Sequence, residues 1–195
     1  MADRSATTEF FGSRAEGWDD RFPDDGPAYA SAVAALGLAP GATALDAACG
    51  TGRAVPLLRA AVGWHGRVVA VDVTPEMLSV AAAKGRAGGL VRADVVDLPL
   101  AAAAVDAVLA AGLLAHLDDP AAGLAELARV TRRGGRLALF HPISRAALAA
   151  RHGREPDPED LRRPHIIAPL LRRHGWEPEL LDDGPDRYLV VARRR

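Results

Sequence analysis

The decapeptide ALDAACGTGR, residues 44–53, decides the fold of this 195-residue chain. A short apolar run ends in Asp46, and Gly50 and Gly52 follow before a helical pattern begins. Because glycine lacks a Cβ, such a turn bends sharply and brings backbone N–H groups close to a bound molecule. The stretch therefore predicts a strand, a tight turn and a helix, with an adenosine-containing ligand held against the main chain.

A second acid, Asp72, stands twenty residues beyond Gly52 and closes the apolar run RVVAVD at residues 67–72. At this place in a Rossmann-type sheet, a carboxylate accepts hydrogen bonds from ribose hydroxyls. A nicotinamide enzyme and an S-adenosylmethionine enzyme both use this arrangement, so the acid leaves both open. The glycine spacing separates them, since a dinucleotide turn reads G-x-G-x-x-G and this chain has Asp46-x-Ala48-x-Gly50-x-Gly52.

This series resembles motif I of class I S-adenosylmethionine-dependent methyltransferases, D/E-x-G-x-G-x-G, with Ala48 in place of the family's first glycine. Residues 72–78 (DVTPEML) are similar to the family's D-x-S-x-x-M-L segment, and residues 91–100 (VRADVVDLPL) to its D-x-x-x-L-P motif. The resemblance continues to residue 140 and is closest to small-molecule methyltransferases typified by quinone-biosynthesis enzymes.

The resemblance implies a set of residues that hold S-adenosylmethionine, with Asp72 on the ribose, Asp94 on the adenine amino group and Val95 on a ring nitrogen. The complete set is Asp46, Ala48, Cys49, Gly50, Gly52, Asp72, Val73, Met77, Asp94, Val95, Ala110 and Trp18. Core packing is the alternative interpretation of Met77, and a turn cap is that of Asp94.

Composition indicates an ordinary globular protein, with 49% apolar residues, 25% charged residues and a net charge of −1. That charge argues against nucleic-acid binding, and no apolar run is long enough to span a bilayer, so we expect a cytoplasmic protein without membrane contact. Cys49 is the only cysteine, which excludes an intrachain disulfide and a multi-cysteine metal site. We interpret Cys49 as a packing residue, expect no metal, and leave monomer and homodimer open.

The order of elements predicts an α/β fold: a Rossmann-like, doubly wound, seven-stranded sheet, mostly parallel with the last strand antiparallel, and helices on both faces. Strands are expected at residues 43–48, 68–72, 90–94, 105–111 and 136–141, and a terminal hairpin pairs 176–181 with 187–192. Helices are expected at residues 27–38, 53–62, 75–84, 120–133 and 164–174. Thr74 and Asp119 are expected to cap the helices that follow them. We expect residues 1–195 to form a single domain, with 1–40 as an aromatic arm and helix and 41–195 as the Rossmann-like core.

The arm carries the aromatic residues Phe10, Phe11, Trp18 and Phe22. Arms of this kind in the resembled family often cover cofactor and substrate, so Trp18 or Arg14 is expected to contact the methionine end of the cofactor or the acceptor. Phe10 and Phe11 are expected instead to pack the arm onto the sheet.

His116 and His141 are the candidates for a general base, because they follow the fourth and fifth strands, whose carboxyl ends face the ligand crevice of such a sheet. A satisfied loop histidine is the alternative for each.

The predicted function is S-adenosylmethionine-dependent methyl transfer to a small molecule, an activity of class EC 2.1.1. Residues 110–113 read AAGL where methyltransferases of nucleic-acid bases or glutamine carry N/D-P-P-Y/F, which argues against that class. Two alternatives stay open: a protein of the same fold that binds the cofactor without methyl transfer or uses the fold for another reaction, and a nicotinamide-dependent oxidoreductase.

Overall fold

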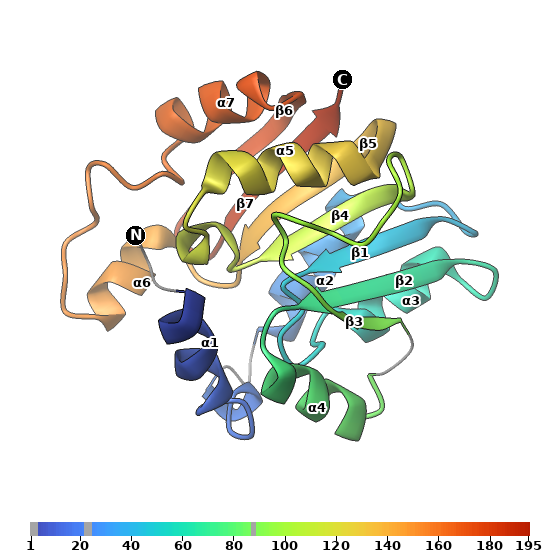
Figure 1. Cartoon of the computed structure of the whole chain (residues 1–195). Coiled ribbons are helices and arrows are strands. Elements are labelled where there is room, and N and C mark those ends of the chain that lie inside the picture. The colour runs from blue at the N-terminus through green and yellow to red at the C-terminus, as the bar shows by residue number, and fades with distance from the viewer. Residues whose placement is uncertain (1–3, 22–24, 87–88) are drawn as a thin grey trace.

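A seven-stranded sheet forms the centre of the molecule, with its strands in the order β3-β2-β1-β4-β5-β7-β6 (Figure 1). The computed structural model describes residues 4–21, 25–86 and 89–195. The strands are β1 (Thr43–Ala47), β2 (Arg67–Asp72), β3 (Leu90–Arg92), β4 (Val105–Ala111), β5 (Thr131–His141), β6 (Trp176–Asp183) and β7 (Tyr188–Arg194). Neighbours are parallel except at β7, which runs antiparallel to both β5 and β6. The predicted fold class is confirmed.

Helices cover both faces of this sheet. They are α1 (Arg4–Gly12), α2 (Gly26–Ala35), α3 (Val55–Val62), α4 (Pro75–Ala83), α5 (Pro120–Val130), α6 (Arg145–Arg151), α7 (Pro164–Arg173) and the short 3-10 helices η1 (Asp19–Arg21) and η2 (Leu114–His116). Val108 of β4 packs into the core cluster that includes α5 and α7, and its neighbour Leu109 packs into the cluster that includes α2 and α3. Since successive strand residues point to opposite faces, a strand buried on both faces needs a nearly continuous apolar run, and β4 has one in residues 107–111.

Two predicted helix caps have different outcomes. Asp119 caps α5, because its side chain accepts a hydrogen bond from the backbone N–H of Ala122 at 2.9 Å. Thr74 stands at the N-cap position of α4, but its side chain makes no capping bond, so that expectation is wrong. Asp72 accepts from the backbone N–H of Thr74 at 2.8 Å and so holds the chain at the start of α4.

The fifth strand begins earlier than predicted, directly after α5 rather than at Arg136. Thr131 pairs with Val105 of β4, and a register shift before Arg136 accommodates the intervening residues. The short helices α1 and α6 are also absent from the sequence prediction. Neither carries a strong apolar periodicity, so local pattern could not reveal them.

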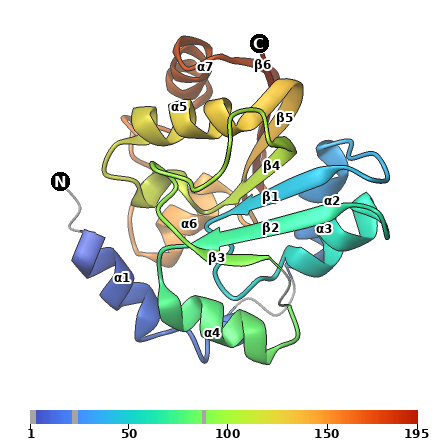
Figure 2. The same ribbon diagram turned by 45° about the vertical axis from the view of Figure 1, so that its right-hand side comes forward.

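The N-terminal arm packs against α4 rather than on the sheet (Figures 1 and 2). The expectation that Phe10 and Phe11 pack onto the sheet is therefore wrong. Phe10 is 46% exposed, and its ring meets that of Phe11 edge to face with centroids 5.2 Å apart. Phe22 lies outside the described residues. None of the helices in the described ranges is long and apolar enough to cross a membrane.

The direction of the strands defines where a ligand can bind. The arrowheads of β1, β2 and β4 point toward the side of the molecule where α1 and α6 lie (Figure 2). Strand order reverses between β1 and β4, and in open α/β sheets the crevice outside the carboxyl ends at such a reversal is the usual ligand site.

Candidate active site

A cavity of about 790 Å³ lies at this reversal, a size suited to a cofactor together with a small molecule. The glycine turn, the segments after β2, β4 and β5, the arm and α6 all contribute to its wall. Of the twelve predicted cofactor-binding residues, ten line it: Asp46, Ala48, Cys49, Gly50, Asp72, Val73, Met77, Asp94, Val95 and Trp18.

Asp72 ties the glycine turn to the end of β2. One of its carboxylate oxygens accepts from the backbone N–H of Gly50 at 2.8 Å, and the other accepts from Thr74. Burial raises the pKa of this carboxyl, although these backbone donors act in the opposite direction. Asp72 also lines the cavity.

Ala48, the departure from the family's glycine, has a φ of 61°. This left-handed conformation costs an alanine roughly 1–2 kcal/mol relative to the right-handed region, whereas glycine adopts it freely. The turn thus has the left-handed backbone conformation that glycine would adopt at this position, and Ala48 is strained in that conformation.

Asp46 is the least satisfied group in the site. Its side chain is 1% exposed and lines the cavity, yet neither carboxylate oxygen has a hydrogen-bond partner among the described residues. Burial, together with the negative charge of Asp72, raises the pKa of Asp46 to about 7. Buried polar groups are nearly always hydrogen-bonded, so this carboxylate fits a ligand that brings a donor.

Asp94 and Met77 each take the structural role given as an alternative, and both also line the cavity. The Asp94 carboxylate accepts from the backbone N–H of Val96 at 3.0 Å, which is a turn cap, and the residue also lines the cavity. Met77 is 2% exposed, so it packs in the interior while it forms part of the wall. Burial raises the pKa of the Cys49 thiol, which agrees with a packing role rather than a nucleophilic one.

Gly52 and Ala110 do not line the cavity. A Cβ on Gly52 would lie 3.1 Å from the Cβ of Arg86, so this glycine allows the turn to approach the segment after α4. Ala110 points into the core from β4, and the wall is formed by the next residues, Ala111 and Gly112. Side chains alternate between the two faces of a strand, so a prediction that is wrong by one residue selects a side chain on the opposite face.

The arm closes one side of the cavity with aromatic rings. Phe11 meets Trp18 edge to face at 5.3 Å and His116 at 4.9 Å between ring centroids. Arg14 does not line the cavity, because its guanidinium lies over the Phe10 ring at 4.0 Å. The expectation for Arg14 is therefore not supported by its position.

Asp19, which sequence reasoning missed, holds the arm in place. Its carboxylate accepts from the Thr51 hydroxyl in the glycine turn and from Lys84 and Arg86 beyond α4, each of the latter at 2.7 Å. The nearby Asp25 forms a second ion pair with Arg53. These contacts join residues tens of positions apart in the sequence, so no local sequence pattern predicts them.

Both candidate bases line the cavity. His141 follows Phe140 at the end of β5, and its Nδ1 lies 3.0 Å from the carbonyl oxygen of Ile143. Burial lowers the pKa of His141 to about 4, and burial with the nearby charge of Arg162 lowers that of His116. Both imidazoles are therefore neutral at neutral pH and able to accept a proton.

The sequence matches the family described as "Methyltransferase domain" over residues 45–139. A SAM-dependent methyltransferase from Aquifex aeolicus has the same fold, with a TM-score of 0.78 and 25% identity, over 94% of this chain and 98% of that one. A SAM-dependent methyltransferase from Thermotoga maritima, described as a possible histamine N-methyltransferase, gives a TM-score of 0.72 at 19% identity, over 97% and 100% of the two chains. The match over residues 45–139 and the Aquifex aeolicus structure support a class I S-adenosylmethionine-dependent methyltransferase family for this chain, and the fold and domain imply S-adenosylmethionine as the cofactor.

A relative among curated proteins is an uncharacterized 37.1 kDa protein in transposon TN4556 of Streptomyces fradiae, 37% identical over 105 residues. The match covers 52% of this chain and 30% of that protein, so the chain spans less than a third of the relative's length.

Proposed function

We propose that this protein transfers a methyl group from S-adenosylmethionine to a small-molecule acceptor. The observation that carries the proposal is that one cavity contains both the acidic glycine turn and two neutral histidines. The nicotinamide alternative loses support, because the family match and the Aquifex aeolicus structure both concern methyltransferases.

The residues present fit the cofactor. Asp72 and Asp94 offer carboxylate acceptors for the ribose hydroxyls and the adenine amino group, and Asp46 offers an unpartnered carboxylate for a donor at the methionine end. Gly50 and Val95 line the same wall, and the backbone N–H of Gly50 holds the Asp72 carboxylate there. When bound, S-adenosylmethionine supplies an electrophilic methyl group on its sulfonium.

The chain itself contributes position, exclusion of water and proton transfer. In-line transfer depends mainly on alignment of the donor carbon and the nucleophile, which the cavity wall provides. Phe11 and Trp18 of the arm shield this space from water. An acceptor oxygen or nitrogen that loses a proton would deliver it to His116 or His141.

A small acceptor is favoured over a macromolecule by the position of the arm. The ring of Phe11 touches that of His116, so the arm and the candidate base enclose the acceptor end from two sides. A net charge of −1 gives no general attraction for nucleic acid.

Incubation with methyl-labelled cofactor and a panel of small metabolites tests the proposal. The expected result is S-adenosylhomocysteine together with a labelled product. Tight cofactor binding without turnover across the panel would favour the alternative of a binding protein.

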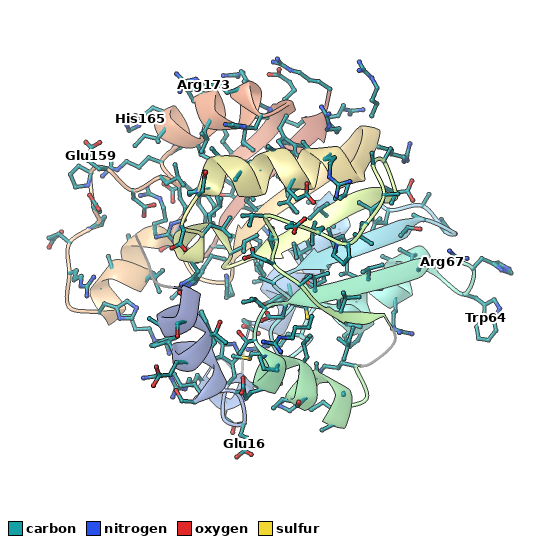
Figure 3. All side chains as sticks on the ribbon, viewed as in Figure 1. Glu16, Trp64, Arg67, Glu159, His165 and Arg173 are labelled. Carbon is teal, nitrogen blue, oxygen red and sulfur yellow. The ribbon has the colours of Figure 1, made fainter. Side chains whose placement is uncertain are left out.

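Alanine variants of the histidines test their role once an acceptor is found. H116A or H141A should slow transfer at least tenfold with unchanged cofactor affinity, and an unchanged rate removes that residue from the mechanism. H165A is a matched control, since His165 is exposed on α7 away from the cavity (Figure 3).

A further inference from the structure

A second, much smaller cavity of about 50 Å³ lies behind the two histidines. His116 and His141 line both this space and the large cavity, so they form part of the wall between them. Tyr188 and Arg162 line the small cavity but not the large one. Neither residue has a role in the cofactor site described above.

Tyr188 carries a buried hydroxyl that has no hydrogen-bond partner among the described residues. It is the first residue of β7, is 2% exposed, and stands opposite His141 in the antiparallel pairing of β5 and β7. Residues opposite each other in an antiparallel pair project to the same face of the sheet. The hydroxyl is therefore on the same side of the sheet as the histidine pair. Buried polar groups are nearly always hydrogen-bonded, so this hydroxyl requires a hydrogen-bond partner.

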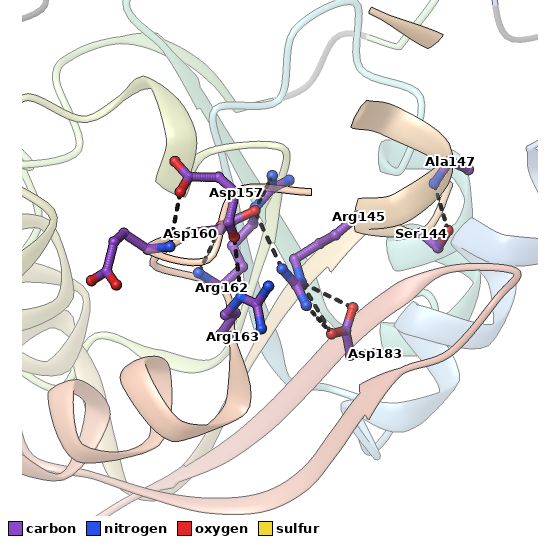
Figure 4. Close-up of polar contacts among 9 residues, drawn as sticks. Ser144, Arg145, Ala147, Asp157, Asp160, Arg162, Arg163 and Asp183 are labelled. Carbon is purple, nitrogen blue, oxygen red and sulfur yellow. Dashed lines mark hydrogen bonds and ion pairs between the residues drawn. The ribbon is translucent and has the colours of Figure 1, made fainter. Parts of the chain in front are cut away.

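Arg162 is held in the wall of the small cavity by a chain of charged groups (Figure 4). Its guanidinium makes two hydrogen bonds to the Asp160 carboxylate, at 2.9 and 2.8 Å. Asp160 lies 3.6 Å from Arg145, and Arg145 donates in turn to Asp183 at 3.0 Å. The charges alternate along this chain, so Arg162 is anchored and presents an N–H donor group beside the small cavity.

The two histidines differ in what orients them. His141 is held by the backbone of Ile143, because its Nδ1 lies 3.0 Å from the carbonyl oxygen and 3.3 Å from the backbone nitrogen of that residue. The imidazole of His116 has no hydrogen bond to any residue in the described part of the chain, and only the edge-to-face contact with Phe11 is seen. A general base needs a defined tautomer, so His116 lacks the partner that His141 has.

We propose that Tyr188 is a positioning residue for His116, acting through water held in the small cavity between the tyrosine hydroxyl and the imidazole. The water selects one tautomer of His116 and leaves the other ring nitrogen facing the acceptor. A cavity needs only about 10–15 Å³ to hold a water molecule, and one with polar groups on its wall favours it. The role of His116 toward the acceptor rests on the proposed methyl transfer, whereas the hydrogen bond itself does not.

Nuclear magnetic resonance of the protein with ¹⁵N-labelled histidine tests this proposal without any assay of activity. In the wild type, the His116 ring nitrogens should report one dominant tautomer. In Y188F, which removes only the hydroxyl, that preference should fall at least tenfold toward a mixture. His141 is the internal control, because Ile143 orients it in both proteins.

A high-resolution crystal structure provides the second measurement. It should show ordered water within hydrogen-bond distance of both the Tyr188 hydroxyl and a His116 nitrogen. An unchanged His116 tautomer in Y188F, or a small cavity without such water, would overturn the proposal. Failure of the proposed methyl transfer is recognised separately, as the absence of product with every acceptor while the tautomer result stands. If an acceptor is known, Y188F should lower kcat and alter its pH profile without changing cofactor affinity.

Discussion

Replacement of Asp19 by asparagine should speed the release of S-adenosylmethionine, because this one carboxylate joins the arm to the cofactor turn. It accepts from Thr51, which follows Gly50 in the turn, and from Lys84 and Arg86 beyond α4. Arg86 also donates to the backbone carbonyl of Thr51 at 2.9 Å, so the three partners form one connected group. An asparagine keeps the shape of the side chain but removes the charge that these donors share.

The pKa of Asp19 sets the size of the effect. Burial acts to raise it, but the hydrogen bonds from Lys84, Thr51 and Arg86 outweigh burial and lower it from 3.8 to about 2. At 1.36 kcal/mol for each pKa unit, this difference corresponds to about 2.4 kcal/mol. Lys84 is 36% exposed, so solvent screening reduces the usable part to about 1–2 kcal/mol. Opening of the arm should then become roughly 5–30 times more frequent.

The sign of the pH dependence follows from the lowered pKa. Asp19 stabilises the docked arm fully above its unfolded value of 3.8, and this contribution is lost as the pH falls toward 2. Measurements near neutral pH therefore report the full difference between Asp19 and asparagine.

Stopped-flow fluorescence of Trp18, which lines the cavity, can follow release. A W64F background removes the signal of Trp64, which is 95% exposed and projects at the far side of the molecule from α1 (Figure 3). D20N is the matched control, because Asp20 is an exposed neighbour in the same short helix. Equal release rates in D19N and D20N would refute the reasoning.

Three further changes test the turn and the base. D46N should raise the free energy of unfolding at pH 8 by about 1–2 kcal/mol while it weakens cofactor binding, since the charge is removed and the amide still lacks a partner. The raised pKa of Asp46 means that wild-type stability increases as the pH falls from about 7 toward 3.8, and D46N should lose this slope in chemical denaturation. A48G should be at least as stable as the wild type, because φ is 61°, whereas A48V should lose about 2 kcal/mol or more; the opposite order would contradict strain at Ala48. If His141 is the base, its pKa of about 4 predicts a transfer rate that stays level down to about pH 5, and a decline centred near 6.5 would exclude it.

The sheet could be predicted from sequence because its strands are buried on both faces. Residues 105–111 form an apolar run interrupted only by Asp106, and β4 has those bounds. The glycine turn could also be predicted, since Gly50 has a φ of 54° that other residues rarely adopt. Each of these features, the strand and the turn, depends on a few neighbouring residues, so a short stretch of sequence predicts it.

The contacts that complete the site join residues far apart in the sequence, so no short stretch of sequence predicts them. Asp19 meets Lys84 across 65 positions of the chain, and the arm was predicted to pack on the sheet when it packs on α4. Tyr188 faces the histidine pair only because the terminal hairpin pairs it with His141. Hairpin register can be inferred from sequence, but the space between two side chains cannot.

The unsatisfied groups of this protein are not scattered. The buried side-chain atoms without a hydrogen-bond partner in the described ranges are both oxygens of Asp46, Nη1 of Arg145 and the hydroxyl of Tyr188. Asp46 faces the large cavity, Tyr188 faces the small one, and Arg145 belongs to the charge chain that holds Arg162. Buried polar atoms without partners cost stability, so stability is lower at these positions than the packed core would allow. Cofactor binding should therefore recover stability through Asp46, with a larger rise in melting temperature for the wild type than for D46N at the same excess of cofactor over Kd.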